Sequence, residues 1–219
     1  MATDLIPQPV EETVDHLLLG VGDLDRGIEW VEKLTGVKAV YGGRHPGLGT
    51  KNALLSLGGW RYLEIIAPDP AQPAFRFRID LPSLAAPRLI SWAASTQNPD
   101  SIRKIGQQEG YRIVGPDEGS RARPDGRVLR WTTVGLRTPF DRSGIEVVPF
   151  FIRWVEDSRH PSQDSPQGCT LASFHIIHPE AAGLDRALTR FGIQMRVRRG
   201  EQAALSAILE TPKGRVEIT

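Results

Sequence analysis

The chain has 219 residues, and its 27 Lys and Arg against 26 Asp and Glu give a formal charge of +1. That balance provides no bulk electrostatic attraction to nucleic acid or to a membrane surface. The single cysteine, Cys169, excludes an internal disulfide and a thiolate metal cluster. Residues 1–10 show no signal-peptide pattern, and no apolar run of about 20 residues follows. We therefore expect a cytoplasmic protein with neither nucleic acid nor membrane as a partner.

The first part of the chain predicts a strand, a helix and three further strands. Residues 14–21 form an apolar run of strand length. Asp23 is suited to cap the following helix and Gly36 to end it. The apolar face of that helix is formed by Leu24, Ile28, Val31 and Leu34. Strands are then predicted at residues 37–41, 52–57 and 61–67.

The same order of elements recurs twice. The second stretch predicts a strand at 88–94 and a helix from Asn98-Pro99 to Gly110. Its later strands are predicted at 112–114, 128–135 and 146–154, and the loop 115–127 is expected to be exposed and mobile. The third stretch predicts a strand at 169–178, a helix after Pro179, and strands at 194–198, 203–209 and 215–218.

The repeated order predicts the fold class. Each unit has a one-sided sheet face to bury, so the units must pack together. We predict an α+β fold of βαβββ modules at residues 14–70, 87–155 and 169–219, with the helices outside cupped mixed β-sheets. A small polar or metal-chelating molecule would lie in the cup.

Several motifs are similar to the vicinal oxygen chelate superfamily and its branch of glyoxalase-like domain proteins. They are Val14-Asp15-His16-Leu17, Gly22-Asp23-Leu24-Asp25, Leu34-Thr35-Gly36-Val37, Tyr62-Leu63-Glu64-Ile65-Ile66, Phe150-Phe151-Ile152-Arg153-Trp154 and Arg159-His160-Pro161-Ser162. The resemblance implies paired modules in a U-shaped cup. It also implies a divalent metal (Zn, Ni, Mn or Fe) held by a histidine on the first strand and a glutamate on the last strand of a module. The resemblance implies a scaffold more than a reaction.

On this resemblance, His16 and Glu64 match the two ligand positions of the first module, and Glu217 echoes Glu64 in the third. The second module has Leu89-Ile90 and Phe151-Ile152-Arg153 at the matching positions, and Ala172 stands where the third module would need its histidine. No four-ligand set appears, which leaves a weak or solvent-completed metal site, or none. The residues also allow His16 to be a hydrogen-bonded core histidine and Glu64 to pair with an arginine.

Further candidates concern the ligand. Trp92 and Trp131 are predicted to line the cup and stack on a planar molecule, and Arg130 or Arg153 to meet its anionic group. His45, in the predicted loop before the third strand, either reaches over the cup or is a plain turn residue.

Two functions remain open from the sequence. The first is a metal-dependent lyase, isomerase or dioxygenase acting on a small oxygen-bearing molecule, in which Glu64 shuttles a proton. The second is a metal-free protein that binds and sequesters a small molecule. Whether the chain is an enzyme is left open, and either a monomer or a homodimer is compatible with the pattern.

Overall fold

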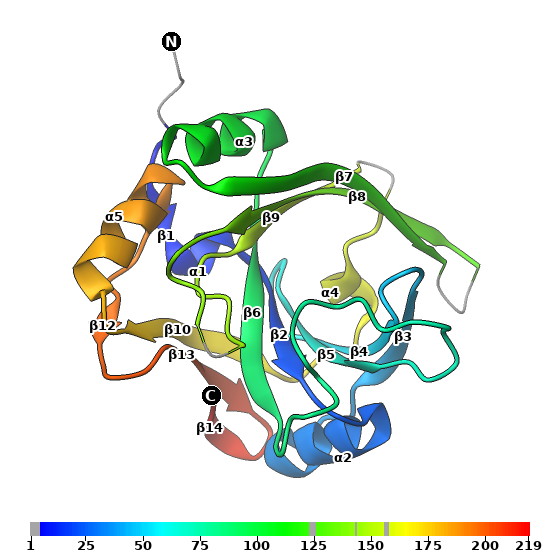
Figure 1. Cartoon of the computed structure of the whole chain (residues 1–219). Coiled ribbons are helices and arrows are strands. Elements are labelled where there is room, and N and C mark those ends of the chain that lie inside the picture. The colour runs from blue at the N-terminus through cyan, green and yellow to red at the C-terminus, as the bar shows by residue number, and fades with distance from the viewer. Residues whose placement is uncertain (1–4, 123–125, 143, 156–157) are drawn as a thin grey trace.

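The computed structural model describes residues 5–122, 126–142, 144–155 and 158–219. One eight-stranded sheet dominates it, in the order β3-β4-β5-β2-β6-β9-β8-β7. Its strands are β2 (Val14–Gly20), β3 (Val40–His45), β4 (Thr50–Ser56), β5 (Tyr62–Pro68), β6 (Arg88–Ser95), β7 (Arg112–Ala122), β8 (Val128–Arg137) and β9 (Phe150–Trp154). The sheet curls until its two edge strands, β3 and β7, contact each other, which makes a deep cup (Figure 1).

A second, four-stranded sheet has the order β12-β10-β13-β14. Its strands are β10 (Thr170–His178), β12 (Arg198–Arg199), β13 (Ala204–Thr211) and β14 (Gly214–Ile218). The short strands β1 (Gln8–Pro9) and β11 (Ile193–Gln194) pair in parallel beside it. Strand β13 contacts β6, so the second sheet lies beside the middle of the large one (Figure 1).

The helices are α1 (Val10–Thr13), α2 (Leu24–Thr35), α3 (Pro99–Gln108), α4 (Pro161–Asp164) and α5 (Ala181–Arg190). Asp23 caps α2 by accepting a hydrogen bond from the backbone nitrogen of Arg26 at 3.0 Å, and Gly36 ends it with a φ of 81°. The longer helices α2, α3 and α5 lie outside the sheets (Figure 1). The predicted α+β class with a cupped mixed sheet is confirmed. In the described part of the chain, no helix has the length and apolar character needed to cross a membrane.

The strand order relates the predicted modules to one another. Strands β2 to β5 and β6 to β9 make the two halves of the cup, and β10 to β14 lie outside the large sheet. The division at 14–70, 87–155 and 169–219 stays a prediction. Only the first two of these stretches supply strands to the cup.

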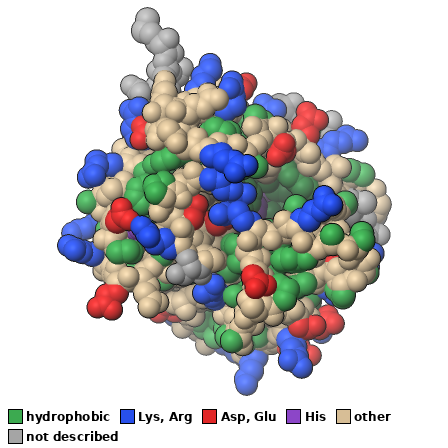
Figure 2. Space-filling model, viewed as in Figure 1, with side chains coloured by type: hydrophobic (Ala, Val, Ile, Leu, Met, Phe, Trp, Pro, Cys, Tyr) green, Lys and Arg blue, Asp and Glu red, His purple; other side chains and the backbone are tan. Residues whose placement is uncertain are grey.

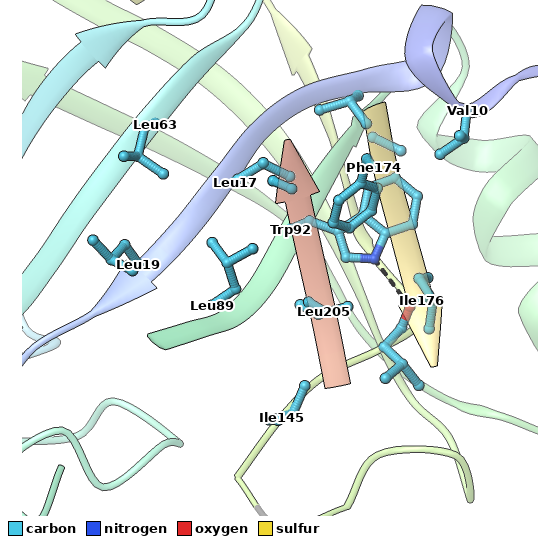
Figure 3. Packing of buried hydrophobic residues seen from close by; sticks show 14 of the residues in the cluster. Val10, Leu17, Leu19, Leu63, Leu89, Trp92, Ile145, Phe174, Ile176 and Leu205 are labelled. Carbon is cyan, nitrogen blue, oxygen red and sulfur yellow. Dashed lines mark hydrogen bonds between the residues drawn. The ribbon is translucent and has the colours of Figure 1, made fainter. Parts of the chain in front are cut away.

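The main hydrophobic core fills the space between the convex side of the cup and the second sheet (Figure 3). Trp92 on β6 is fully buried, with its ring centroid 5.1 Å from that of Phe174 on β10. Its Nε1 donates a hydrogen bond to the carbonyl oxygen of Val147 at 2.9 Å. Because side chains alternate along a strand, burying Trp92 in this core turns its neighbour Ser91 toward the inside of the cup.

Two strand predictions need correction. The stretch predicted as an exposed, mobile loop at 115–127 contains the second half of β7, which pairs with β8 as far as Ala122. A register shift between Val114 and Asp117 lets the strand continue past Gly115-Pro116. The strand predicted at 37–41 lies at Val40–His45, so His45 ends a strand instead of standing in a loop.

Candidate functional site

The concave face of the large sheet encloses a cavity of about 340 Å³, within the range of small-molecule sites. The space-filling view shows this hollow, with hydrophobic side chains inside it and basic side chains beside it (Figure 2). Aromatic residues form much of the wall: Tyr62, Phe77, Trp131, Phe150 and Trp154. The cavity can therefore hold an apolar or planar body, and its chemistry depends on the polar groups among these rings.

His16 and Glu64 project into this cavity from the neighbouring strands β2 and β5. His16 is in register with Tyr62, and Leu18 with Glu64, so alternate residues of both strands face the same side. The Nε2 atom of His16 lies 3.5 Å from Oε2 of Glu64. The structure thus brings together the two residues that the sequence placed at the floor of the cup.

The carboxylate of Glu64 is buried, and three further polar side chains lie around it. Asn52 donates a hydrogen bond to Oε1 at 2.6 Å, and Nε2 of His45 lies 3.4 Å from the same oxygen. Arg121 donates through Nη1 to Oδ1 of Asn52 at 2.9 Å. Burial raises the pKa of Glu64, but the charges of His45, His16 and Arg121 and the hydrogen bond from Asn52 together hold it below its ordinary value. Glu64 is therefore a charged carboxylate at neutral pH.

Asp15 holds His16 through the ring nitrogen that faces away from Glu64. Its carboxylate only accepts hydrogen bonds, so His16 donates through Nδ1, at 2.7 Å, and its Nε2 faces Glu64. Asp15 also accepts from His160, Ser95 and Trp154, at 3.2, 3.2 and 2.9 Å. Burial raises the pKa of Asp15, but the hydrogen bonds and charges of His16 and His160 keep it well below the usual range. A buried charge with four donors holds the imidazole in one orientation.

Of the other sequence-predicted ligand-binding residues, His45 and Trp131 line the cavity. The placement of Trp92, Arg130 and Glu217 needs correction. Trp92 lies in the core, as described above. Arg130 is exposed, because its neighbour Trp131 faces inward and successive residues of a strand face opposite sides. Glu217 lies exposed on β14 in the second sheet, where it accepts a hydrogen bond from Ser206, so the structure does not bring it to His16 and Glu64.

The sequence reasoning did not single out Asn52, Asp15 or Arg121. Asn52 had a usable signal, since an amide within the apolar run of a strand needs a buried partner. Asp15 likewise precedes His16 in an otherwise apolar strand. Arg121 stands in an arginine-dense stretch, 121–130, that allows either a solvated loop or an anion-binding rim, but nothing in the sequence distinguishes it from the other arginines there.

The fit of a metal ion can be judged from these side chains. Imidazole and carboxylate are groups that divalent metals accept, so a divalent metal is compatible with the His16–Glu64 pair. His45, however, contacts the other oxygen of Glu64. Within the described residues, no group of three or more His, Cys, Asp or Glu side chains is arranged to hold a metal ion. These residues do not fit a resident metal centre with three protein ligands.

Comparisons with known proteins agree with the fold. A family model described as "Glyoxalase-like domain" matches residues 14–192. No curated protein matches the chain. A hypothetical protein from Staphylococcus aureus has a similar structure, with a TM-score of 0.66 and 16% identity over 87% of both chains.

Methylmalonyl-CoA epimerase from Mycobacterium tuberculosis gives a TM-score of 0.44 at 20% identity, over 68% of this chain and 91% of the epimerase. A variant of the Streptomyces coelicolor methylmalonyl-CoA epimerase gives a TM-score of 0.44 at 20% identity, over 64% of this chain and 95% of the epimerase. The family model covers most of the chain. The protein therefore belongs to the glyoxalase-like domain family of the vicinal oxygen chelate superfamily.

Proposed function

We propose that the protein is an enzyme of the isomerase or lyase type. It would remove a proton from a carbon next to a carbonyl group of a small molecule, with Glu64 as the base. The observation that carries this proposal is the buried, charged Glu64 at the floor of an aromatic cavity, with an imidazole near each of its oxygens. A buried carboxylate is costly in a purely structural role, and groups of this kind concentrate at catalytic sites.

The proposed step uses only groups of this chain. Glu64 forms an O–H bond with the proton, the C–H bond breaks, and its electron pair moves to the neighbouring carbonyl oxygen as an enolate. In an isomerase, Glu64 then delivers the proton to another carbon of the same conjugated enolate. In a lyase, the enolate electrons re-form the carbonyl and expel a leaving group from the neighbouring carbon with its bonding electrons, and Glu64 gives its proton to the departing group. Burial lowers the pKa of His45, and the charges of Arg121 and His16 lower it further, against an opposing effect of Glu64. The cavity therefore disfavours the protonated form of His45, which lies 3.4 Å from Glu64.

The metal-dependent form of this function has less support. A metal ion would find His16 and Glu64 here and would need its remaining ligands from water or substrate. A dioxygenase would need a redox-active metal centre, whose ligand set the described residues do not form. The proposed step therefore uses no metal ion.

The alternative is a metal-free protein that binds and sequesters a small molecule. One observation favours it: the environment of Glu64 lowers its pKa, and a carboxylate with a lowered pKa is a weaker base. Binding alone would use the aromatic walls and leave the carbon–hydrogen bonds of the ligand intact.

Deuterium exchange separates the two functions. We expect the protein in D₂O with excess EDTA to exchange the protons next to the carbonyls of octane-2,3-dione faster than buffer does, followed by ¹H NMR. Saturable exchange in EDTA supports the enzyme without a metal. Exchange that disappears with EDTA and returns with Zn²⁺, Ni²⁺, Mn²⁺ or Fe²⁺ would restore the metal-dependent function. Broadened dione signals without exchange would support the binding protein.

A further inference from the structure

The buried guanidinium of Arg121 has hydrogen-bonding capacity that the described protein does not use. Arg121 is 7% exposed, lies near the end of β7 and lines the cavity. Its Nη1 donates to Asn52, but its Nε is buried without a hydrogen-bond partner. A buried donor left unpaired is expensive, and such atoms are rare in folded proteins. Because Arg121 lines the cavity, its incompletely hydrogen-bonded guanidinium is placed to bind an oxygen atom of a ligand.

Asn52 places this donor beside the proposed base. The same side-chain amide donates to Glu64 through Nδ2 at 2.6 Å and accepts from Arg121 through Oδ1 at 2.9 Å. One residue of β4 thus fixes the carboxylate on β5 and the guanidinium on β7 relative to each other. The charge of Arg121 also acts on Glu64, as the lowered pKa of that carboxyl records.

Of the other three arginines that line the cavity, Arg78 and Arg137 have carboxylate partners and Arg76 is exposed. Arg78 forms an ion pair with Glu146, and Arg137 lies 3.6 Å from the same carboxylate. Asp141 lies 3.8 Å from Arg78 and adds a second acidic group to this cluster. Two guanidiniums facing two carboxyl groups leave little excess charge. Arg121 is therefore the buried arginine of the cavity wall that is placed to meet a new negative charge beside Glu64.

The floor between the two polar clusters is apolar. Glu64 on β5, Leu18 on β2 and Ser91 on β6 are in register across three adjacent strands. Strands lie about 4.8 Å apart, so roughly 10 Å of floor, with Leu18 in its middle, separates Glu64 from Ser91, which donates to Glu146. A ligand whose reacting group lies at Glu64 would extend an apolar chain along Leu18.

We propose that Arg121 is a catalytic residue that stabilises the oxyanion, and that the substrate is a carbonyl compound with an apolar chain. The guanidinium of Arg121 donates to the carbonyl oxygen, and negative charge moves from Glu64 to that oxygen as Glu64 takes the proton. The interaction strengthens as the reaction proceeds, which is what lowers a barrier. This inference rests on the proposed function, because it places the reacting carbon next to Glu64.

The test measures binding and does not depend on turnover. In Glu64→Gln, the neutral amide stands for the protonated glutamate that the transfer would produce. The nitronate anion of 1-nitrohexane imitates an enolate with an apolar chain, and neutral 1-nitrohexane is its matched control. Quenching of Trp131 and Trp154, which line the cavity, reports binding of both probes at one pH, before the nitronate is reprotonated.

We expect the nitronate to bind to Glu64→Gln at least about 100-fold more tightly than 1-nitrohexane, the size of effect of one well-placed oxyanion donor. Adding Arg121→Met to Glu64→Gln should reduce this preference, the affinity for the nitronate divided by that for 1-nitrohexane, to below about tenfold. Arg130→Met removes an exposed arginine of the adjacent strand and should leave the ratio unchanged. If Arg121→Met does not fold, Arg121→Lys decides, because lysine keeps the charge and loses the planar fork. The affinity ratio of Glu64→Gln with Arg121→Lys should be at least about tenfold lower than that of Glu64→Gln alone.

An unchanged ratio in a folded Arg121 variant, or no preference of Glu64→Gln for the nitronate, would overturn the role of Arg121. The proposed function is judged separately by deuterium exchange. One combined outcome is deuterium exchange that depends on Glu64 while the affinity ratio stays the same in the Arg121 variants. That combination would keep Glu64 as the base and reject Arg121 as the oxyanion donor.

Discussion

Glu64→Gln is expected to lower the rate of deuterium exchange into octane-2,3-dione by about 10²–10⁴-fold, the usual contribution of a positioned general base. Glutamine keeps the shape of the side chain and an oxygen that can accept from Asn52, whose amide donates to Oε1 of Glu64 at 2.6 Å. The change therefore removes the base and leaves the cavity intact. Exchange followed by ¹H NMR at several dione concentrations separates the lost rate from any change in binding.

Glu217→Gln is the matched control for this prediction. Glu217 resembled Glu64 in sequence, but it lies exposed on β14, outside the cup. We expect its exchange rate to equal that of the wild-type protein. Equal losses in both variants would point to a general effect of removing a carboxylate. Exchange in Glu64→Gln within about threefold of wild type would remove Glu64 from the role of base.

Asp15→Asn is expected to lower the free energy of unfolding by about 3–5 kcal/mol, as for a buried charge network that loses one partner. The carboxylate of Asp15 accepts four hydrogen bonds inside the protein, from His16, Ser95, Trp154 and His160. An amide replaces one accepting oxygen with a donor, which faces side chains that already donate. Urea denaturation at pH 7, with the slope compared between variants, measures the loss.

The loss should depend on pH in a defined direction. The pKa of Asp15 in the folded protein lies below the unfolded value of about 3.9. Its stabilising contribution is therefore complete well above pH 3.9 and is lost as the pH falls toward the folded-state pKa. The difference between wild type and Asp15→Asn should thus be smaller at pH 3 than at pH 7.

Asp100→Asn serves as the control, since Asp100 is an exposed residue of α3 that forms a surface ion pair with Arg103, at 3.5 Å. A surface pair contributes little, and we expect a change within about 0.5 kcal/mol. A loss in Asp15→Asn as small as that of the control would contradict the anchoring role of Asp15.

The floor of the cavity was predictable from the sequence. His16 and Glu64 stand in apolar strands at positions that face the same side by simple alternation, and the structure places them 3.5 Å apart. Trp131 and Trp92 were both predicted to line the cup from the pairing of the first two modules, and Trp131 does line it. Trp92 does not, and the sequence could not show this, because β6 is buried on both faces, and a strand of this kind shows no alternation to reveal which side lines the cup.

The position of Arg121 beside Glu64 could not be predicted for a different reason. Its position depends on β7 continuing past a register shift to pair with β8, and on Asn52, which is 69 residues away in the chain. For Glu217 the sequence predicted a place in the site that the structure does not give it. A local motif repeats in the third stretch, but the sheet that contains it is separate from the cup.

The charge state of Glu64 is the physical basis of the proposed function, and ¹³C NMR of its side-chain carboxyl carbon measures it directly. The signal is assigned by its absence in Glu64→Gln. We expect the shift of a carboxylate at pH 7, unchanged on acidification until the pH is below 4.5, the ordinary value for a glutamate. A signal that titrates near or above pH 7 would mean that Glu64 is a neutral acid at rest, and would contradict its role as the base.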